Sequence, residues 1–306
     1  MINRKNNLSG LRPPIVLPGI LSVLICLLLL PSGVLAQHPV EVERQAASAE
    51  YFQSLVTFDK LPQRRTTTSA ILAAARSAWG LSLPERAGEE LEAALRDPNL
   101  DSTERGRIHL TRGIIEFQEG RWQVAALYAQ KAAEAATESE TLRSRSMLLW
   151  AEALSELQSF GLADEKYKAA AEAAAVEDQP EIAFGHGSAL YALGRYDEAR
   201  LAFERVPLGH ERTADAIKSL ARIALETGRT ASAEFWLNKG RADFPDRFLD
   251  SWVDYALLKV AIDQKDQSKV KSIRDAAAGR YPPSDFWVSL MNAAAEAFEW
   301  EQTHQG

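Results

Sequence analysis

The sequence predicts an all-α protein in which helix-turn-helix units stack in a row to form an α-solenoid. Three observations support this fold class. Small residues recur at a nearly fixed period of 34 to 38 residues between residues 68 and 283, and periods of this length are typical of stacked arrays. Alanine-rich runs such as residues 169–175 favour helices and allow their axes to approach closely. No stretch combines β alternation with hairpin turns.

Residues 181–206 define the repeating unit best. A first amphipathic helix ends near Leu193 and a second begins at Tyr196, with Gly194 in the turn between them. Gly187 lies inside the first helix, where a glycine costs about 1 kcal/mol relative to alanine. We therefore expect another helix to come very close at this position. Three residues follow at helical spacing on one face of the second helix: Ala199, Phe203 and Val206.

The same register predicts six units, which start near residues 68, 106, 144, 180, 214 and 251. Each second helix has a small residue at one fixed position, called here the anchor. The anchors are Ala87, Ala125, Ala163, Ala199, Ala233 and, as the weakest match, Val270. A lone helical hairpin cannot bury its apolar side, so each unit must pack against the next.

The two ends of the array need their own elements. Residues 37–67 predict a lead-in helix and then a loop, because Pro62 interrupts the apolar pattern of that segment. We favour a helix that packs over the first unit, with a separate binding arm as the alternative. Residues 284–306 predict a C-terminal capping helix and tail, since the end of a solenoid requires a cap with a polar outer face.

The first 36 residues have the pattern of a secretory signal peptide. A basic, acid-free end precedes a largely apolar stretch, and small residues precede a cleavage point before Gln37. We expect an exported protein, either periplasmic or secreted. The alternative is an uncleaved anchor formed by residues 13–36, because the apolar stretch is just below the usual spanning length. This anchor would be the protein's only contact with the membrane.

Cleavage would change the charge and the cysteine content. The removed segment contains Arg4, Lys5 and Arg12 but no acid, so the net charge moves from −7 to −10. An acidic chain gains nothing from nucleic-acid phosphates, and we predict no DNA or RNA partner. The single cysteine is Cys26, and the bulky Ile25 before it disfavours a lipoprotein. The mature chain then has no cysteine for a disulfide, a nucleophile or a metal site.

Three units carry a pattern that resembles the tetratricopeptide repeat. The best match is at Gly187, Gly194, Tyr196, Ala199 and Phe203, and the next is at Gly113, Gly120, Trp122, Ala125 and Ala132. A third copy is at Gly228, Ala233 and Pro245, while the units that start at 68, 144 and 251 are degenerate. The resemblance covers residues 68 to 282 and implies a right-handed α-solenoid of about six repeats with a capping helix. Spacings above 34 residues then imply lengthened helices or turns.

No residue pattern predicts catalysis. The five histidines do not pair at metal-ligand spacing, and the sequence has no nucleophile elbow, phosphate loop or dinucleotide fingerprint. We interpret His109 and His186 as packed or partly exposed repeat residues. Carboxylates are plentiful but lie on helix faces near basic residues, which is typical of a solvated surface. We therefore predict a non-enzymatic protein without a metal or cofactor.

A solenoid presents a concave face lined by the first helix of each unit. The resemblance implies that the groove positions are the second, fifth, ninth and twelfth residues of each unit. The candidate partner-binding residues at these positions are Arg76, Trp79, Arg107, Phe117, Arg145, Tyr191, Lys218, Arg222, Tyr255 and Lys259. Further groove positions hold Glu152, Phe184 and Trp252. Aromatic side chains and arginines are common anchors for bound peptides, although some of these aromatics are expected to pack between units.

Two functional hypotheses follow. The first is a scaffold exported to the cell envelope that binds a partner protein, or an extended peptide of it, in the concave groove. The second is a structural assembly subunit of an envelope complex that associates through its convex face or its ends. An enzyme or a glycan-binding module is disfavoured. The repeat pattern does not specify the partner or the oligomeric state, because repeat folds host many unrelated functions.

Overall fold

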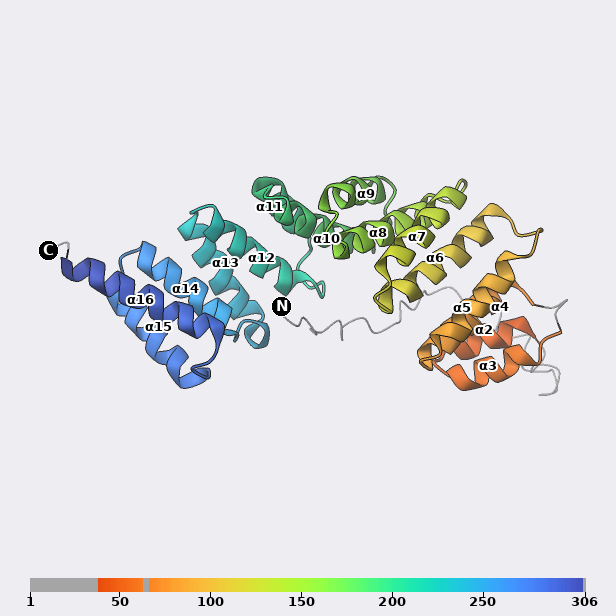
Figure 1. Cartoon of the computed structure of the whole chain (residues 1–306), viewed down its shortest axis with the longest axis horizontal. Coiled ribbons are helices and arrows are strands. Elements are labelled where there is room, and N and C mark those ends of the chain that lie inside the picture. Colours follow the sequence, from red (N-terminus) through yellow and green to blue (C-terminus); the bar gives the residue numbers. More distant parts are fainter. Residues whose placement is uncertain (1–37, 63–65, 305–306) are drawn as a thin grey trace. The chain divides into compact units, whose positions relative to one another are not determined.

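A computed structural model describes residues 38–62 and 66–304 of the chain (Figure 1). The predicted signal peptide lies outside these residues. Helices are the regular elements throughout the described residues, which contain no strand. The predicted all-α fold is therefore confirmed. The chain divides into two compact units, of which unit 1 ends at Ile115 and unit 2 begins at Glu116.

Unit 1 contains two lead-in helices where the sequence predicts one. Its elements are α2 (Pro39–Ala47), α3 (Tyr51–Asp59), α4 (Thr68–Gly80), α5 (Pro84–Leu95) and the greater part of α6 (Ser102–Gln118). The break between α2 and α3 falls at Ala49, which has a positive φ of 59°. A left-handed residue ends a helix, but glycine rather than alanine usually marks such a position. Both lead-in helices pack on α4. The hydroxyl of Ser54 on α3 accepts a 3.0 Å hydrogen bond from the hydroxyl of Ser77 on α4.

Unit 2 consists of paired helices and a final single helix. The first helices of its pairs are α8 (Glu140–Glu156), α10 (Gln179–Ala192), α12 (Thr213–Glu226) and α14 (Ser251–Asp263). The second helices are α7 (Trp122–Ala135), α9 (Phe160–Glu172), α11 (Tyr196–Phe203), α13 (Thr230–Asp243) and α15 (Gln267–Arg280). The short 3-10 helix η3 (Pro245–Arg247) precedes α14, and α16 (Phe286–His304) ends the unit.

The contacts between these helices follow the order of the repeats. From α7 to α16 each helix packs on the next one in the chain, with η3 between α13 and α14. In addition, α8 contacts α10, α10 contacts α12, α12 contacts α14, and α14 contacts α16. The first helices therefore form one continuous wall of unit 2, called here the first-helix face. The helices α6 and α8 have 17 residues, compared with 13 or 14 in α10, α12 and α14, and this extra length lengthens the units that start at 106 and 144.

The anchors lie where the helices come closest. Ala87, Ala125, Ala163, Ala199 and Ala233 are each 0% exposed, and Val270 is 1% exposed. Gly187 shows why a side chain is not tolerated at the facing position of α10. A Cβ atom built there would lie 3.0 Å from two ring carbons of Phe203 on α11. The close contact expected at Gly187 is therefore made within its own hairpin.

Three of the six turns between paired helices in the described residues use a left-handed glycine, and the other three have Ser82, Gln158 and Lys265 in the same conformation. Gly120, Gly194 and Gly228 have φ values of 74°, 73° and 66°, which only glycine adopts without strain. Trp122 and Tyr196 each begin the helix that follows such a turn, and Pro245 begins η3. The glycine positions of the repeat pattern thus mark the reversal of the chain.

The end of α11 differs from the predicted one. The sequence predicts Val206 on this helix, but α11 ends at Phe203 and has only 8 residues. Pro207 explains the difference, because a proline disfavours helical backbone at the residue before it and cannot donate a backbone hydrogen bond. Val206 still reaches the core and is 7% exposed. None of the helices in the described part of the chain is both long and apolar enough to cross a bilayer.

The contact at Gly187 generates a stability prediction. Gly187→Leu should lower the free energy of unfolding by about 1–3 kcal/mol, because the new side chain overpacks the contact with Phe203. Gly279 provides a matched control, since it is also helical but a Cβ atom there has no neighbour within 4 Å. Thermal unfolding should show a loss for Gly187→Leu and no loss for Gly279→Leu. Equal melting of both variants would contradict the packing described here.

Candidate partner-binding face

The first-helix face of unit 2 brings together several of the residues predicted for the groove. Arg222 on α12 lies over the ring of Trp252 on α14, with its guanidinium carbon 4.9 Å from the ring centroid. Tyr255 on α14 packs against Trp287 on α16, and their ring centroids are 5.1 Å apart. Each contact joins one first helix to the next. The predicted aromatic and basic side chains therefore form a row along α12, α14 and α16.

A small cavity of about 170 Å³ lies next to this row. It is lined by Ser188, Tyr191, Phe203, Ser219 and Arg222, so it is bordered by two of the predicted groove residues. Pockets that enclose a drug-sized ligand usually have volumes of about 300–1,000 Å³. The cavity is smaller than this, and its size fits a single side chain of a longer ligand.

The charged side chain at this cavity, that of Arg222, forms no ion pair with a described residue. Its guanidinium is exposed. Partial burial raises the pKa of Tyr191, although the positive charge of Arg222 counteracts this effect. Tyr191 is therefore a neutral hydrogen-bonding group beside a free cation. Such a pair is suited to a partner that presents hydrogen-bond acceptors.

Two other predicted cations are held in ion pairs between repeats. Arg145 on α8 donates to Asp178 at 2.8 Å and to Glu177 at 3.2 Å, just before α10. Lys218 on α12 forms an ion pair with Asp250, which caps the start of α14. These contacts join residues 32 or 33 positions apart. The two side chains fix the spacing of neighbouring first helices.

The remaining candidate residues lie at other positions. Lys259 is half-buried on α14. Arg76 and Arg107 are exposed in unit 1, and Trp79 packs against the core of that unit. Phe117 lies at the end of α6, at the start of unit 2. Their role in partner binding stays a prediction.

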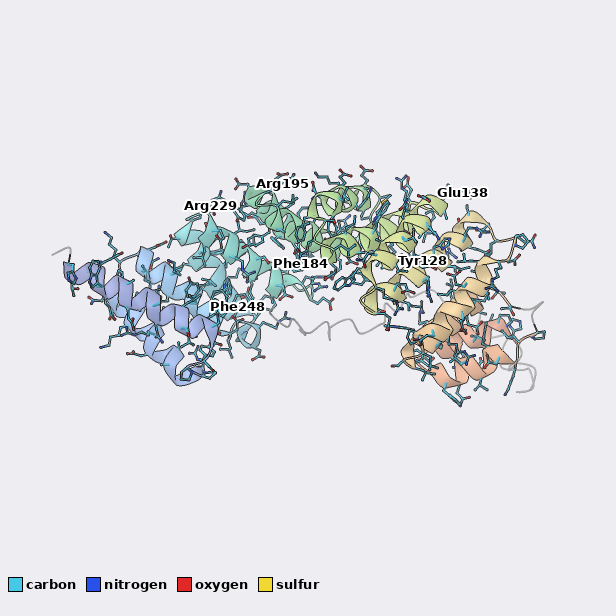
Figure 2. The ribbon with its side chains drawn as sticks, in the orientation of Figure 1. Tyr128, Glu138, Phe184, Arg195, Arg229 and Phe248 are labelled. Carbon is cyan, nitrogen blue, oxygen red and sulfur yellow. The ribbon has the colours of Figure 1, made fainter. Side chains whose placement is uncertain are left out.

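Glu152 is a residue of this face whose ionisation is unusual. It lies on α8, near Glu181 on α10 and near Arg212, which precedes α12. Burial, with the negative charge of Glu181, raises the pKa of Glu152 to about 7, against the opposing effect of Arg212. Arg212 also interacts with two other side chains. It donates a 3.0 Å hydrogen bond to Glu181, and its guanidinium carbon lies 5.2 Å from the ring centroid of Phe184. Phe184 is labelled in Figure 2.

A second polar centre lies at the junction of α9, α10 and α11. Asp164 is buried and accepts hydrogen bonds from Lys168 at 2.8 Å, from His186 at 2.6 Å and from Arg195 at 2.7 Å. Burial alone would raise the pKa of Asp164, but the three donors together hold it well below its usual range. His186 is therefore a packed repeat residue that joins α10 to α9. Asp164 could not be predicted from the sequence, because its donors are up to 31 residues away.

The described residues contain no group of three or more His, Cys, Asp or Glu side chains that could hold a metal ion. Their charged clusters are ion pairs within a helix or between neighbouring helices. We find no arrangement of a nucleophile with a base among the contacts described above.

Comparisons with known proteins agree with this architecture. Residues 190–252 match the family described as tetratricopeptide repeat. No curated protein matches the chain by sequence. Among solved structures, the C-terminal part of a TPR repeat-containing protein from Cytophaga hutchinsonii has a TM-score of 0.64 and 14% identity, covering 83% of this chain and 99% of its own.

Two further structures have a similar fold. The apo form of RapI has a TM-score of 0.59 and 14% identity, covering 83% of this chain and 78% of its own. PilW, described as a widely conserved type IV pilus biogenesis factor, has a TM-score of 0.56 and 16% identity, covering 71% of this chain and 98% of its own. At these identities the likeness is one of fold. With the match at residues 190–252, it confirms the predicted tetratricopeptide-type solenoid.

The raised pKa of Glu152 generates a prediction about pH. Between pH 4.5 and about 7 the folded chain retains a proton that the unfolded chain releases, so stability due to Glu152 falls as the pH rises through this range. Glu152→Gln removes the charge. The variant should be more stable than the parent at pH 8, by up to about 3 kcal/mol, and the gain should vanish near pH 4.5.

Chemical unfolding at a series of pH values measures this difference. Glu165→Gln is the matched control, because Glu165 is an exposed carboxylate on the neighbouring helix α9. A gain of the same size in the control, or a gain that does not change with pH, would contradict the account.

Proposed function

We propose that this tetratricopeptide-repeat protein is a non-enzymatic scaffold that binds an extended segment of a partner protein on the first-helix face of unit 2. The observation that carries the proposal is the position of Arg222. Its guanidinium stacks on Trp252 and borders the cavity that contains Tyr191, yet it has no ion-pair partner among the described residues. A cation held in place by an aromatic ring loses little conformational freedom when it binds a ligand.

The face suits a segment rather than a compact small molecule. The row from Tyr191 through Arg222 and Trp252 to Tyr255 runs over α10, α12 and α14, whereas the cavity has room for one side chain only. An extended peptide can place one side chain in the cavity while its backbone and next side chains contact the aromatic row. Interfaces of this kind depend on a few aromatic and arginine residues.

We also propose that the scaffold acts in the cell envelope. This part of the proposal rests on the signal-peptide pattern of residues 1–36. The partner is then an envelope protein or an extended peptide of one. The similarity to PilW is one of fold, so the partner of that protein is not transferred to this chain.

A binding experiment tests the proposed face. The full chain, the Arg222→Glu variant and the Lys271→Glu variant are immobilised separately and exposed to envelope extract, and retained proteins are identified by mass spectrometry. Lys271 is an exposed residue of α15 without a described ion pair, so its variant controls for charge. We expect a partner that Arg222→Glu binds about tenfold or more weakly and Lys271→Glu binds normally, as for loss of an interface anchor. Equal retention by all three proteins, or no specific retention, would contradict the proposal.

The alternative is a structural assembly subunit, and exposed leucines favour it. Leu127, Leu162 and Leu201 lie on the second helices α7, α9 and α11 and are 49%, 52% and 54% exposed. Trp300 on the terminal helix α16 is 62% exposed. Large apolar side chains grouped on a surface can mark an association site. A stable homo-oligomer in sedimentation analysis that Leu162→Glu dissociates would favour assembly over peptide binding.

A further inference from the structure

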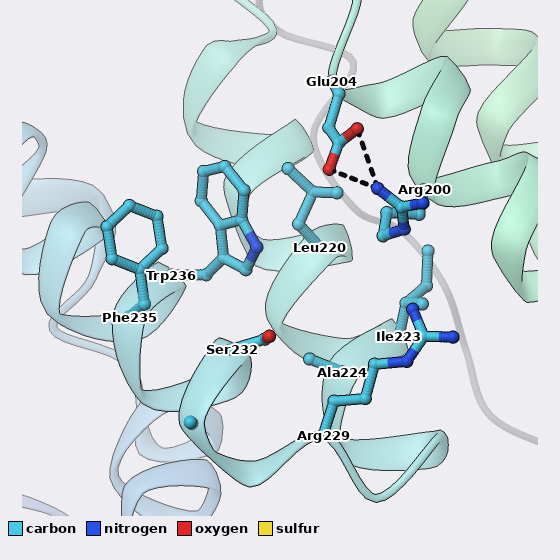
Figure 3. A pocket seen from close by; sticks show the side chains of 10 residues that line it. Arg200, Glu204, Leu220, Ile223, Ala224, Arg229, Ser232, Phe235 and Trp236 are labelled. Atoms are coloured by element: carbon cyan, nitrogen blue, oxygen red, sulfur yellow. Dashed lines mark hydrogen bonds and ion pairs between the residues drawn. The ribbon is translucent and has the colours of Figure 1, made fainter.

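The structure has a second hollow, on the side of unit 2 where α11 and α13 lie next to α12. We call it the α11–α13 cleft, and its volume is about 430 Å³. Leu220, Ile223 and Ala224 of α12 line its apolar part, and Phe235 and Trp236 of α13 line one wall (Figure 3). The charged residues that line the cleft are two arginines, Arg200 and Arg229, and one acid, Glu204. The volume falls within the usual range of ligand sites, about 300–1,000 Å³.

The two junctions on either side show what normally occupies this position. At both of these junctions the residue after the anchor contacts the following repeat. After Ala163 this residue is Asp164, which accepts a 2.7 Å hydrogen bond from Arg195. After Ala233 it is Glu234, which accepts a 2.6 Å hydrogen bond from Lys269. Both flanking junctions therefore contain a carboxylate from one repeat and a cation from the next.

At the α11–α13 cleft the carboxylate is replaced by a cation. The residue after the anchor Ala199 is Arg200, and the residue equivalent to Arg195, four positions before the next anchor, is Arg229. Arg195 and Arg229 lie along the same edge of unit 2 in Figure 2. At the two positions that hold an acid and a base at the junction of α9 and α11, this junction has two arginines, and its carboxylate is Glu204, one turn further along the chain from Arg200.

Each of the two arginines pairs with one carboxylate of this chain, and both carboxylates reach solvent. Arg200 donates to both oxygens of Glu204, at 2.8 and 3.0 Å, through a single nitrogen. The Nε atom of Arg200 is buried and has no hydrogen-bond partner. Arg229 pairs with Asp197, whose side chain is 72% exposed. An unpaired buried donor beside a second cation is a site that an anion would stabilise.

The rest of the cleft indicates what carries the anion. Phe235 is 59% exposed, which is unusual for a phenylalanine in mid-helix, and its ring packs edge-to-face on Trp236. The indole nitrogen of Trp236 and the hydroxyl of Ser232 point toward the same space (Figure 3). A small carboxylate ligand would fill only the charged part of the cleft and would leave the apolar part empty. A protein segment with an acidic residue next to an aliphatic or aromatic one would occupy both parts.

We propose that the α11–α13 cleft is a second binding site, which takes a segment of a partner protein containing a carboxylate beside an apolar side chain. The carboxylate lies between Arg200 and Arg229 and takes the place of the acid present at the neighbouring junctions. The apolar side chain packs on Phe235 and Trp236. The site shares α12 with the first-helix face but uses different side chains of that helix, namely Leu220 and Ile223 rather than Ser219 and Arg222.

The test uses peptides of defined sequence. A library of random 12-residue peptides is selected against the full chain, and the enriched peptides are synthesised and titrated by fluorescence anisotropy. Each is paired with a version in which Glu or Asp becomes Gln or Asn. We expect enriched peptides with an acid beside Leu, Ile or Phe, and about tenfold or more weaker binding of the amide version, as for loss of a charged hydrogen bond.

The main variant combines Arg200→Glu with Glu204→Lys, which recreates the acid and base found at Asp164 and Lys168. It should bind the peptides about tenfold or more weakly while melting at or above the temperature of the parent, because a carboxylate now faces Arg229. Phe235→Ser, at an exposed position, should also weaken binding. Arg205→Glu controls for charge at an exposed position and should leave the affinity unchanged. Arg222→Glu should also leave it unchanged, because Arg222 belongs to the first-helix face.

Three results would overturn the proposal. They are enrichment of peptides without an acid, equal weakening by Arg205→Glu, and competition by glutarate as strong as that of the peptides, which would indicate a site for a small anion only. If Arg222→Glu alone removes binding, the selected peptides occupy the first-helix face. That outcome would support the proposed function and reject the second site.

Discussion

The structure depends on one constraint, which is that no helical hairpin of this chain can bury its apolar side without its neighbours. The anchors allow close packing. Five of them are alanines with 0% exposure, whose small side chains let the second helix of each pair approach the helices around it. Each repeat thereby stabilises the next, and stability is approximately a sum over neighbouring pairs. The polar contacts follow the same rule, since Arg145, Lys218 and Asp164 each join one repeat to the following one.

This arrangement separates the residues that hold the array together from those that are free to bind. The first-helix face uses some of its charges to link repeats, as at Arg145, and leaves others such as Arg222 without an ion-pair partner among the described residues. On the second-helix side, a carboxylate of one repeat and a cation of the next close two of the junctions, whereas at the junction of α11 and α13 two arginines occupy these positions and Glu204 pairs with Arg200 at the end of α11. The proposed second site lies where this repeat pattern of charge is broken.

The sequence predicts the fold well because the anchors and turn glycines are local and periodic. Ala199, Phe203 and Gly194 occupy the positions expected from the repeat, and the glycine at 187 is explained by the ring of Phe203. The second lead-in helix was missed because Ala49 is left-handed without being glycine. The end of α11 was misplaced because hydrophobic spacing at Val206 was given more weight than the proline that follows it.

The site was harder to predict from sequence than the fold. A groove position predicts which way a side chain faces in the repeat. Whether that side chain is free to bind a partner protein depends on the residue that it meets in the next repeat, about 30 positions along the chain. Arg145 and Lys218 are engaged by acids before the next first helix, whereas Arg222 stacks on a tryptophan. The pKa of Glu152 is raised because folding buries its carboxyl group and, to a smaller extent, because Glu181 comes near it. Such pairings arise from the stacking of repeats and have no signal within a single one.

Hydrogen exchange measured helix by helix on an Ala199→Leu variant tests the central constraint most directly. Overpacking this anchor should cost about 1–3 kcal/mol. If repeats are stabilised by their neighbours, protection should fall most in α10, α11 and α12, less in α14 and least in α16. An equal loss in every helix of unit 2 would indicate a single shared core, and a loss confined to α11 would indicate independent helices. Either result would contradict the account.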